Sequence, residues 1–172
     1  LILAPTRELA DQIGQAGAQF GGVVGLSGAA LYGGMSKRPQ DEKLRRGVDV
    51  VVACPGRLLD HVDTGTIDLR GIEVLVLDEA DQMCDMGFLP DVRRIIAQLP
   101  TQRQTLFFSA TMPKDIAELA EAMLRDPARV AVTPVASTVE RITQRIIQVD
   151  HSNKPAFLAN LLKQETVNRA LV

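Results

Sequence analysis

Three carboxylates stand within four positions, directly after a short run of branched apolar residues. Asp78, Glu79 and Asp81 follow the apolar residues 74–77. That run lacks period-2 alternation and is typical of a strand buried on both faces of a parallel sheet. Ligands of open α/β sheets bind beyond the carboxyl ends of the strands. One carboxylate there can hold a hydrated Mg²⁺ while its neighbour orients or deprotonates a water; a solvated turn is the simpler alternative.

Compact polar motifs follow three other predicted strands in the same way. They are Pro5-Thr6-Arg7-Glu8 after residues 1–4, Cys54-Pro55-Gly56-Arg57 after residues 48–53, and Ser109-Ala110-Thr111 after residues 104–108. Because parallel strands all end on the same side, the four motifs would share one edge of the sheet. That edge would carry two arginines, an acidic metal site and hydroxyl groups able to link them.

Strands and helices alternate along the chain, which predicts an α/β fold with a parallel sheet and flanking helices. The predicted strands cover residues 1–4, 23–31, 48–53, 74–77, 104–108, 129–133, 145–149 and the stretch from 170 onward. The predicted helices cover residues 7–20, 36–46, 57–62, 89–99, 113–124 and 154–163. A polar stretch with proline, serine and threonine at residues 134–144 is typical of a linker.

Length, composition and charge limit which classes of protein the chain can belong to. The 172 residues suggest one domain or slightly more, and 46% hydrophobic residues suffice for a core. A net charge of −2 provides no global basic field, so nucleic acid would have to bind through a local arrangement. Cys54 and Cys84 have neither a metal-ligand spacing nor a disulfide framework, which favours a reducing, cytoplasmic setting. No apolar run is long enough to predict a membrane span.

The motifs APTRELA, YGG, CPGR, DEAD, DMGF and SAT, in this order and spacing, resemble the DEAD-box RNA helicase family across essentially the whole chain. The downstream part resembles the bacterial RhlE-like subgroup. The resemblance implies a RecA-like fold of the P-loop NTPase type that is truncated at its N-terminus. It also implies a partial first domain at residues 1–133, a linker at 134–144 and the start of a second RecA-like domain at 145–172. Apolar residues at both ends, and no initiator Met, lead us to expect a piece of a longer protein.

The resemblance also implies roles for individual residues in an ATP-dependent RNA helicase. Asp78 would hold Mg²⁺ on ATP through water, and Glu79 would act as the general base. Asp81 would link the ATP site to Ser109-Ala110-Thr111, which couples hydrolysis to strand separation. The implied RNA contacts are Pro5, Thr6, Arg7, Glu8, Gly33, Gly34, Pro55, Gly56, Arg57, Gly87 and Phe88. Such contacts would be to the RNA backbone and independent of sequence. Implied protein partners act in RNA processing, ribosome assembly or RNA degradation.

The chain departs from the family pattern in two ways. Cys54 stands where the family usually has Thr, so a hydroxyl is missing near the RNA or at a helix cap. No Gly-Lys dipeptide occurs, so the 172 residues contain no GxxxxGK[ST] phosphate loop, and the adenine-reading segment and second-domain arginines are absent too. We therefore expect the parent protein to hydrolyse ATP and this piece alone to be inactive.

The alternatives are an RNA-binding or RNA-chaperone module without ATP turnover, and an unrelated α/β phosphate-handling enzyme.

Several other side chains have structural interpretations. We expect His61 and His151 to be surface residues, and Cys54 and Cys84 to act as small buried hydrophobes. For Phe88, a place in the core and a role as an RNA wedge are equally favoured.

Overall fold

The computed structural model describes residues 1–132, 145–164 and 169–171. These residues divide into two compact units, Leu1–Pro127 and Ala128–Val172, and each is described by itself. Among the described residues, no helix has the length and apolar character needed to cross a membrane. The predicted linker, residues 134–144, lies outside the described residues.

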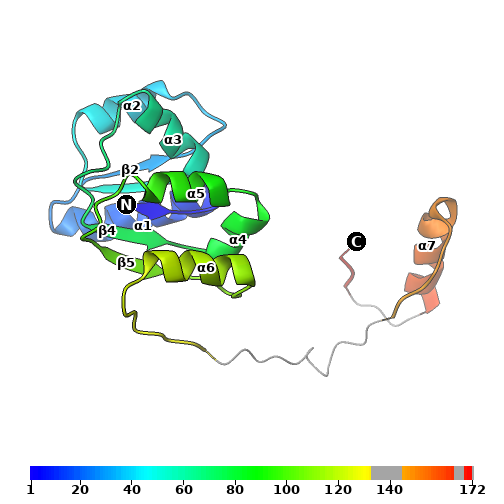
Figure 1. Ribbon diagram of the computed structural model, residues 1–172. Helices are drawn as coiled ribbons and strands as arrows, with labels where there is room; N and C mark the ends of the chain where they lie inside the picture. The colour runs from blue at the N-terminus through cyan, green and yellow to red at the C-terminus, as the bar shows by residue number, and fades with distance from the viewer. Residues whose placement is uncertain (133–144, 165–168, 172) are drawn as a thin grey trace. The chain divides into compact units, whose positions relative to one another are not determined.

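The first unit is built on a five-stranded, entirely parallel sheet with strand order β2-β3-β1-β4-β5 (Figure 1). The strands are β1 (Ile2–Leu3), β2 (Gly28–Leu31), β3 (Val50–Ala53), β4 (Val74–Leu77) and β5 (Gln104–Phe107). The helices are α1 (Arg7–Val23), α2 (Arg38–Arg45), α3 (Pro55–Asp63), α4 (Ala80–Asp85), α5 (Leu89–Ile96) and α6 (Lys114–Met123). The predicted α/β class is confirmed.

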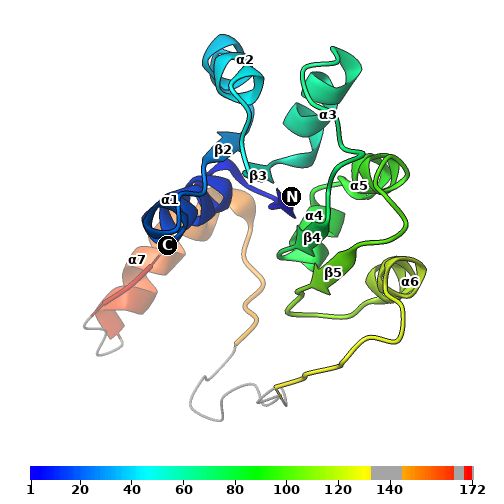
Figure 2. The same ribbon diagram turned by 90° about the vertical axis from the view of Figure 1, so that its left-hand side faces the viewer.

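Helices cover both faces of the sheet, and strand register decides which side chains meet them. Figure 2 shows α1 on one side of the sheet and α3, α5 and α6 on the other. Leu3 pairs with Ala53 on one neighbour and Leu77 on the other, so these side chains share a face. They form the main core together with apolar residues of α3, α4, α5 and α6. A smaller core on the opposite face joins Val52 to Ala10 of α1.

Strand β4 corrects the expectation of a strand buried on both faces. Leu75 and Leu77 are fully buried in the main core, and burying such a side chain contributes about 2 kcal/mol. Val74 is 41% exposed and Val76 is only half-buried. The reason is that α1 packs against β2 and β3 on that face. Within the described chain, β4 is therefore buried on one face.

Other differences concern element boundaries. Helix α1 continues to Val23, so the strand expected at residues 23–31 shortens to Gly28–Leu31. Helix α4 was not expected, because its six residues follow the acidic motif without a full apolar period. Among the described residues of the ranges 129–133, 145–149 and 170–172, none is in a strand. A β-strand needs a neighbouring strand, and the second unit offers only η1 (His151–Asn153) and α7 (Lys154–Gln164) among its described residues.

The N-termini of two helices differ in how they are capped. Thr6 caps α1, because its Oγ1 accepts a hydrogen bond from the Leu9 backbone N–H at 3.2 Å. Cys54 occupies the same position of α3 with the extended backbone of an N-cap, φ −78° and ψ 138°, yet its side chain makes no capping hydrogen bond. The first N–H groups of α3 therefore lack the partner that a hydroxyl would supply.

We expect Cys54→Ser to be more stable than Cys54→Ala by about 1 kcal/mol, because only the serine hydroxyl can cap α3. Urea denaturation of both variants measures the difference, and the alanine variant controls for the loss of the sulfur atom. Equal free energies of unfolding for the two variants would contradict the prediction.

Candidate functional site

The polar motifs meet at the edge of the sheet where its strands end, here called the carboxyl edge. The hydrogen-bond ladder continues one residue beyond three strands. Asp78 N donates to Leu3 O at 3.0 Å, Cys54 N to Leu31 O at 2.9 Å, and Phe108 N to Leu77 O at 2.8 Å. The segments that follow these strands therefore leave the sheet side by side, as the parallel arrangement predicts.

Asp78 and Glu79 stand at the centre of the carboxyl edge. Asp78 is half-buried, and its Oδ1 accepts a hydrogen bond from the Glu79 N–H at 3.0 Å. Glu79 is exposed and adopts a left-handed backbone, φ 52° and ψ 52°. That conformation costs a non-glycine residue about 1–2 kcal/mol. The neighbouring Ala80 N–H, which donates to Phe108 O at 3.0 Å, helps to hold the turn. Strained residues of this kind cluster at functional sites.

The acidic pair fits a particular kind of metal site. Within the described ranges, no group of three or more His, Cys, Asp or Glu residues could enclose a metal ion. Mg²⁺ usually keeps several waters and binds through one or two carboxylates together with substrate phosphates. Asp78 and Glu79 supply the number and type of ligands that such a hydrated ion needs.

Asp81 ties the end of β4 to the segment that follows β5. Its Oδ2 accepts hydrogen bonds from the Thr111 N–H at 2.9 Å and from Thr111 Oγ1 at 2.8 Å. The Asp81 N–H donates to Ser109 Oγ at 3.1 Å, and Ser109 Oγ donates to Thr111 O at 2.7 Å. Ala110, between them, is exposed. The structure thus brings together the residues that the sequence predicted to be linked.

The ionised form of Asp81 is the one that these contacts favour. Partial burial acts to raise the pKa of the carboxyl group. The hydrogen bonds from Thr111 and from the Gln82 N–H act against burial, and the net result is a lowered pKa. The carboxylate therefore stays charged, and can accept both Thr111 hydrogen bonds, well into the acidic range.

Two predicted RNA-contact loops lie against each other at the other end of the carboxyl edge. Gly34 has a φ of +77°, and a Cβ placed on it would lie 3.6 Å from Arg7 Nη1. The Arg7 guanidinium therefore lies beside the turn formed by Gly33 and Gly34, and all three residues are exposed. Arg7 also pairs with Glu8 at 3.2 Å, and such an exposed ion pair contributes little to stability.

Among the predicted contacts that follow β3 and β4, all but Gly87 are more covered. Pro55 is buried at the first turn of α3, and a Cβ on Gly56 would come within 4.0 Å of Asp91 Oδ2 on α5. Gly87 is exposed with a φ of +78°, whereas Phe88 is half-buried and packs against the main core. Of the two roles considered for Phe88, this position favours the one in the core.

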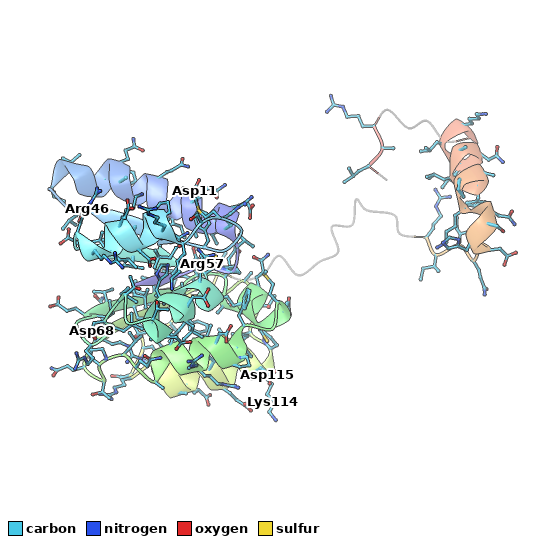
Figure 3. The ribbon with its side chains drawn as sticks, turned by 90° about the horizontal axis from the view of Figure 1, so that it is seen from above. Asp11, Arg46, Arg57, Asp68, Lys114 and Asp115 are labelled. Atoms are coloured by element: carbon cyan, nitrogen blue, oxygen red, sulfur yellow. The ribbon has the colours of Figure 1, made fainter. Side chains whose placement is uncertain are left out.

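Arg57 differs from Arg7 in its surroundings. Its side chain is only 13% exposed, with Nε 3.5 Å from Asp60 Oδ2 and Nη2 donating to Met35 O at 3.3 Å. Figure 3 labels Arg57 in the middle of this unit, whereas Lys114 and Asp115 lie at its rim. The protein therefore engages Nε and Nη2 of the guanidinium, whereas the buried Nη1 has no hydrogen-bond partner among the described residues.

Sequence reasoning missed a buried polar pair next to this arginine. His61 is fully buried and Gln40 is 4% exposed, and His61 Nε2 lies 3.2 Å from Gln40 Oε1. The expectation that His61 is a surface residue is wrong. Leu58 and His61 are three positions apart on α3 and both are fully buried, so helical periodicity was the signal that could have identified it.

The parallel sheet with helices on both faces, and acidic residues beyond a central strand, defines a RecA-like α/β domain. A solved structure described as a hypothetical ATP-dependent RNA helicase from Sulfolobus tokodaii is similar, with a TM-score of 0.69 and 38% identity over 73% of this chain and 38% of that chain. The yeast DEAD-box splicing factor Prp28 matches with a TM-score of 0.69 and 34% identity over 72% of this chain and 30% of that one.

Sequence comparison extends the similarity. DEAD-box ATP-dependent RNA helicase 30 of Oryza sativa subsp. japonica is 46% identical over 90% of this chain and 24% of its own length. ATP-dependent RNA helicase DBP2 of Mycosarcoma maydis is 47% identical over 87% of this chain and 27% of its own length. The chain thus spans about a quarter of these relatives. The sequence profile of the DEAD/DEAH box helicases matches residues 1–119. The chain belongs to the DEAD/DEAH box helicase family.

We expect Asp81→Asn to lower the free energy of unfolding near neutral pH, because an amide cannot replace the charged acceptor of both Thr111 hydrogen bonds. A lowered folded pKa adds stability that is fully present above the unfolded value of about 3.9 and is lost as pH falls through the folded pKa. The difference between variant and wild type should therefore shrink in acid.

Urea denaturation over a series of pH values measures this difference. Asp85→Asn, at an exposed position of the same helix, is the matched control. A destabilisation of Asp81→Asn that stays constant down to strongly acidic pH would contradict the charged-acceptor role.

Proposed function

We propose that this chain is part of the catalytic core of an ATP-dependent RNA helicase, which binds RNA through its backbone and couples ATP hydrolysis to local unwinding of the duplex. The observation that carries the proposal is the hydrogen-bonded link between Asp81 and Thr111, directly beside the acidic pair. Membership of the family supports it, as do relatives whose names describe ATP-dependent RNA helicases.

On the nucleotide side, the chain supplies carboxylates. Asp78 would hold a hydrated Mg²⁺ through water, and the ion would neutralise charge on the ATP phosphates. Glu79 is exposed on its strained turn and would orient the attacking water and accept its proton. Asp81 would couple ATP binding and hydrolysis at this site to the position of Ser109 and Thr111 through the hydrogen bonds described above.

On the RNA side, the loops at the carboxyl edge provide exposed backbone groups and positive charge that can contact the sugar-phosphate chain. Gly33 and Gly34 are exposed and lack side chains, so a sugar-phosphate chain can approach their backbone closely. Arg7, beside them, is 56% exposed and can contact a phosphate. The uncapped N-terminus of α3 after Cys54 offers further N–H groups to phosphate oxygens. None of these groups reads a base, which supports sequence-independent binding.

The finer assignments are also proposals. We assign the chain to the bacterial RhlE-like subgroup on its downstream sequence, and we divide it into a first RecA-like domain to residue 133, a linker at 134–144 and a second domain from 145. We propose ATP and Mg²⁺ as cofactors, and partners in RNA processing, ribosome assembly or RNA degradation. Two half-buried free cysteines, Cys54 and Cys84, support a cytoplasmic location.

The second candidate is an RNA-binding or RNA-chaperone module without ATP turnover. It is favoured by the absence of any Gly-Lys dipeptide from the 172 residues, which therefore contain no GxxxxGK[ST] phosphate loop. The third hypothesis, an unrelated α/β phosphate-handling enzyme, is contradicted by the family match.

The test is Glu79→Gln in a protein that joins this chain to the remaining helicase regions. We expect RNA-stimulated ATP hydrolysis to fall by about 100-fold or more, because removing a general base typically costs that much. ATP binding, measured with a fluorescent analogue, should persist because the substitution preserves shape. Asp85→Asn is the control.

Undiminished hydrolysis in Glu79→Gln would remove Glu79 as the base. RNA binding by the wild-type protein with no RNA-stimulated hydrolysis would favour the module without ATP turnover instead.

A further inference from the structure

Two side chains from different helices hold the two flanks of the Gly33–Gly34 turn. Gln40 Nε2 of α2 donates to the backbone oxygen of Tyr32, before the glycines, at 3.1 Å. Arg57 Nη2 of α3 donates to the backbone oxygen of Met35, after the glycines, at 3.3 Å. The pair of glycines therefore lies between two backbone carbonyl groups that the protein holds in place.

This segment needs such support. Fixing the backbone of one residue costs about 1–2 kcal/mol of conformational entropy, and glycine loses more freedom than any other residue. Gly33 and Gly34 are exposed and have no side chains to pack, and Gly34 has a φ of +77°. The hydrogen bonds on its flanks are therefore contacts that can hold the shape of the turn.

Gln40 is itself held by the buried His61. Because Gln40 Nε2 donates to Tyr32 O, its Oε1 faces His61 Nε2, 3.2 Å away, and the histidine must donate there. On the other side of the ring, Nδ1 lies 3.1 Å from Asp41 Oδ1. Burial, and next Lys37, lower the pKa of His61, while Asp41 acts in the opposite direction. The contact with Gln40 needs the proton on Nε2, and the contact with the Asp41 carboxylate needs a second proton on Nδ1, so only a doubly protonated ring satisfies both while burial opposes that charge.

The two arginines at the carboxyl edge thus have different surroundings. The Arg7 side chain is 56% exposed beside the turn, whereas that of Arg57 is 13% exposed and pairs with Asp60 and Met35. A phosphate can reach the first guanidinium directly. The second is covered by its own protein and donates to the Met35 backbone oxygen, after the glycines.

We infer that Gln40 and Arg57 are positioning residues that hold the Gly33–Gly34 turn in the shape that binds RNA, with His61 orienting Gln40. Arg57 then stabilises the backbone of the turn without touching RNA. Arg7 makes the phosphate contact at this end of the carboxyl edge. The inference rests on the proposed RNA-binding function.

The salt dependence of RNA binding separates a positioning residue from a phosphate contact. For a single strand, each phosphate contact contributes about 0.7 to the slope of log affinity against log salt concentration. We expect Arg7→Ala to weaken binding of a single-stranded uridine oligonucleotide and to reduce the slope by about 0.7. We expect Arg57→Ala and Gln40→Met to weaken binding by about fivefold, the factor for one lost hydrogen bond, with the slope unchanged.

Fluorescence anisotropy with the 172-residue chain measures both quantities. Gln19→Met makes the same change as Gln40→Met at an exposed position of α1, and should leave affinity unaltered. A reduced slope for Arg57→Ala would make Arg57 a direct phosphate contact. Unaltered affinity in Gln40→Met would overturn the positioning role.

Backbone 15N relaxation at Gly33 and Gly34 tests the support of the turn independently of RNA, because order parameters report motion of exposed amides as well. We expect lower order parameters at both glycines in Gln40→Met, with the rest of the first unit unchanged. If the wild-type chain binds no RNA, the proposed function fails for this chain, and the support of the turn is still decided by relaxation. Unchanged order parameters at both glycines would overturn it, and so would an equal loss of order across the whole unit.

Discussion

The common direction of the five strands is the constraint on which the rest of the structure depends. Each strand is only two to four residues long, so its end, and the polar motif after it, is fixed by pairing with its neighbours. The ladder bond from Asp78 N to Leu3 O brings the acidic motif beside the first strand's motif. A register slip of one residue would turn Leu77 away from the main core and move the acidic pair along the edge. The hydrophobic core therefore fixes the geometry of the site.

The residues at the carboxyl edge fall into three groups with different roles. In the function we propose, Asp78 and Glu79 would supply charge for a metal and a water, and Arg7 would supply charge for a phosphate. Asp81 supplies neither, because its carboxylate is engaged by Thr111. It joins the segments after β4 and β5 through these hydrogen bonds. The same distinction separates exposed Arg7 from covered Arg57, although the two residues look equivalent in the sequence.

The sequence predicts the sheet and its edge well because both depend on local signals. Short apolar runs followed by Pro, Asp or Ser mark the strands and their ends, and the parallel arrangement then places Asp81 near Thr111. Other features depend on contacts that no local pattern encodes. The cover over Arg57 comes from a turn more than twenty residues earlier, and the burial of His61 depends on Gln40 of another helix. Val74 is apolar yet 41% exposed, because α1 packs over the neighbouring part of the sheet.

The link between Asp81 and Thr111 joins the segments after β4 and β5. We propose that this link couples ATP binding to RNA binding, and thermodynamic coupling tests that claim most directly. RNA affinity would be measured with and without a non-hydrolysable ATP analogue, in the protein that carries this domain with its remaining helicase regions. Thr111→Val removes the Oγ1 donor and keeps the shape of the side chain. We expect the variant to bind each ligand alone as the wild type does, but to lose most of the coupling, typically about 1–3 kcal/mol between two sites. An unchanged effect of the analogue on RNA affinity would contradict the connection.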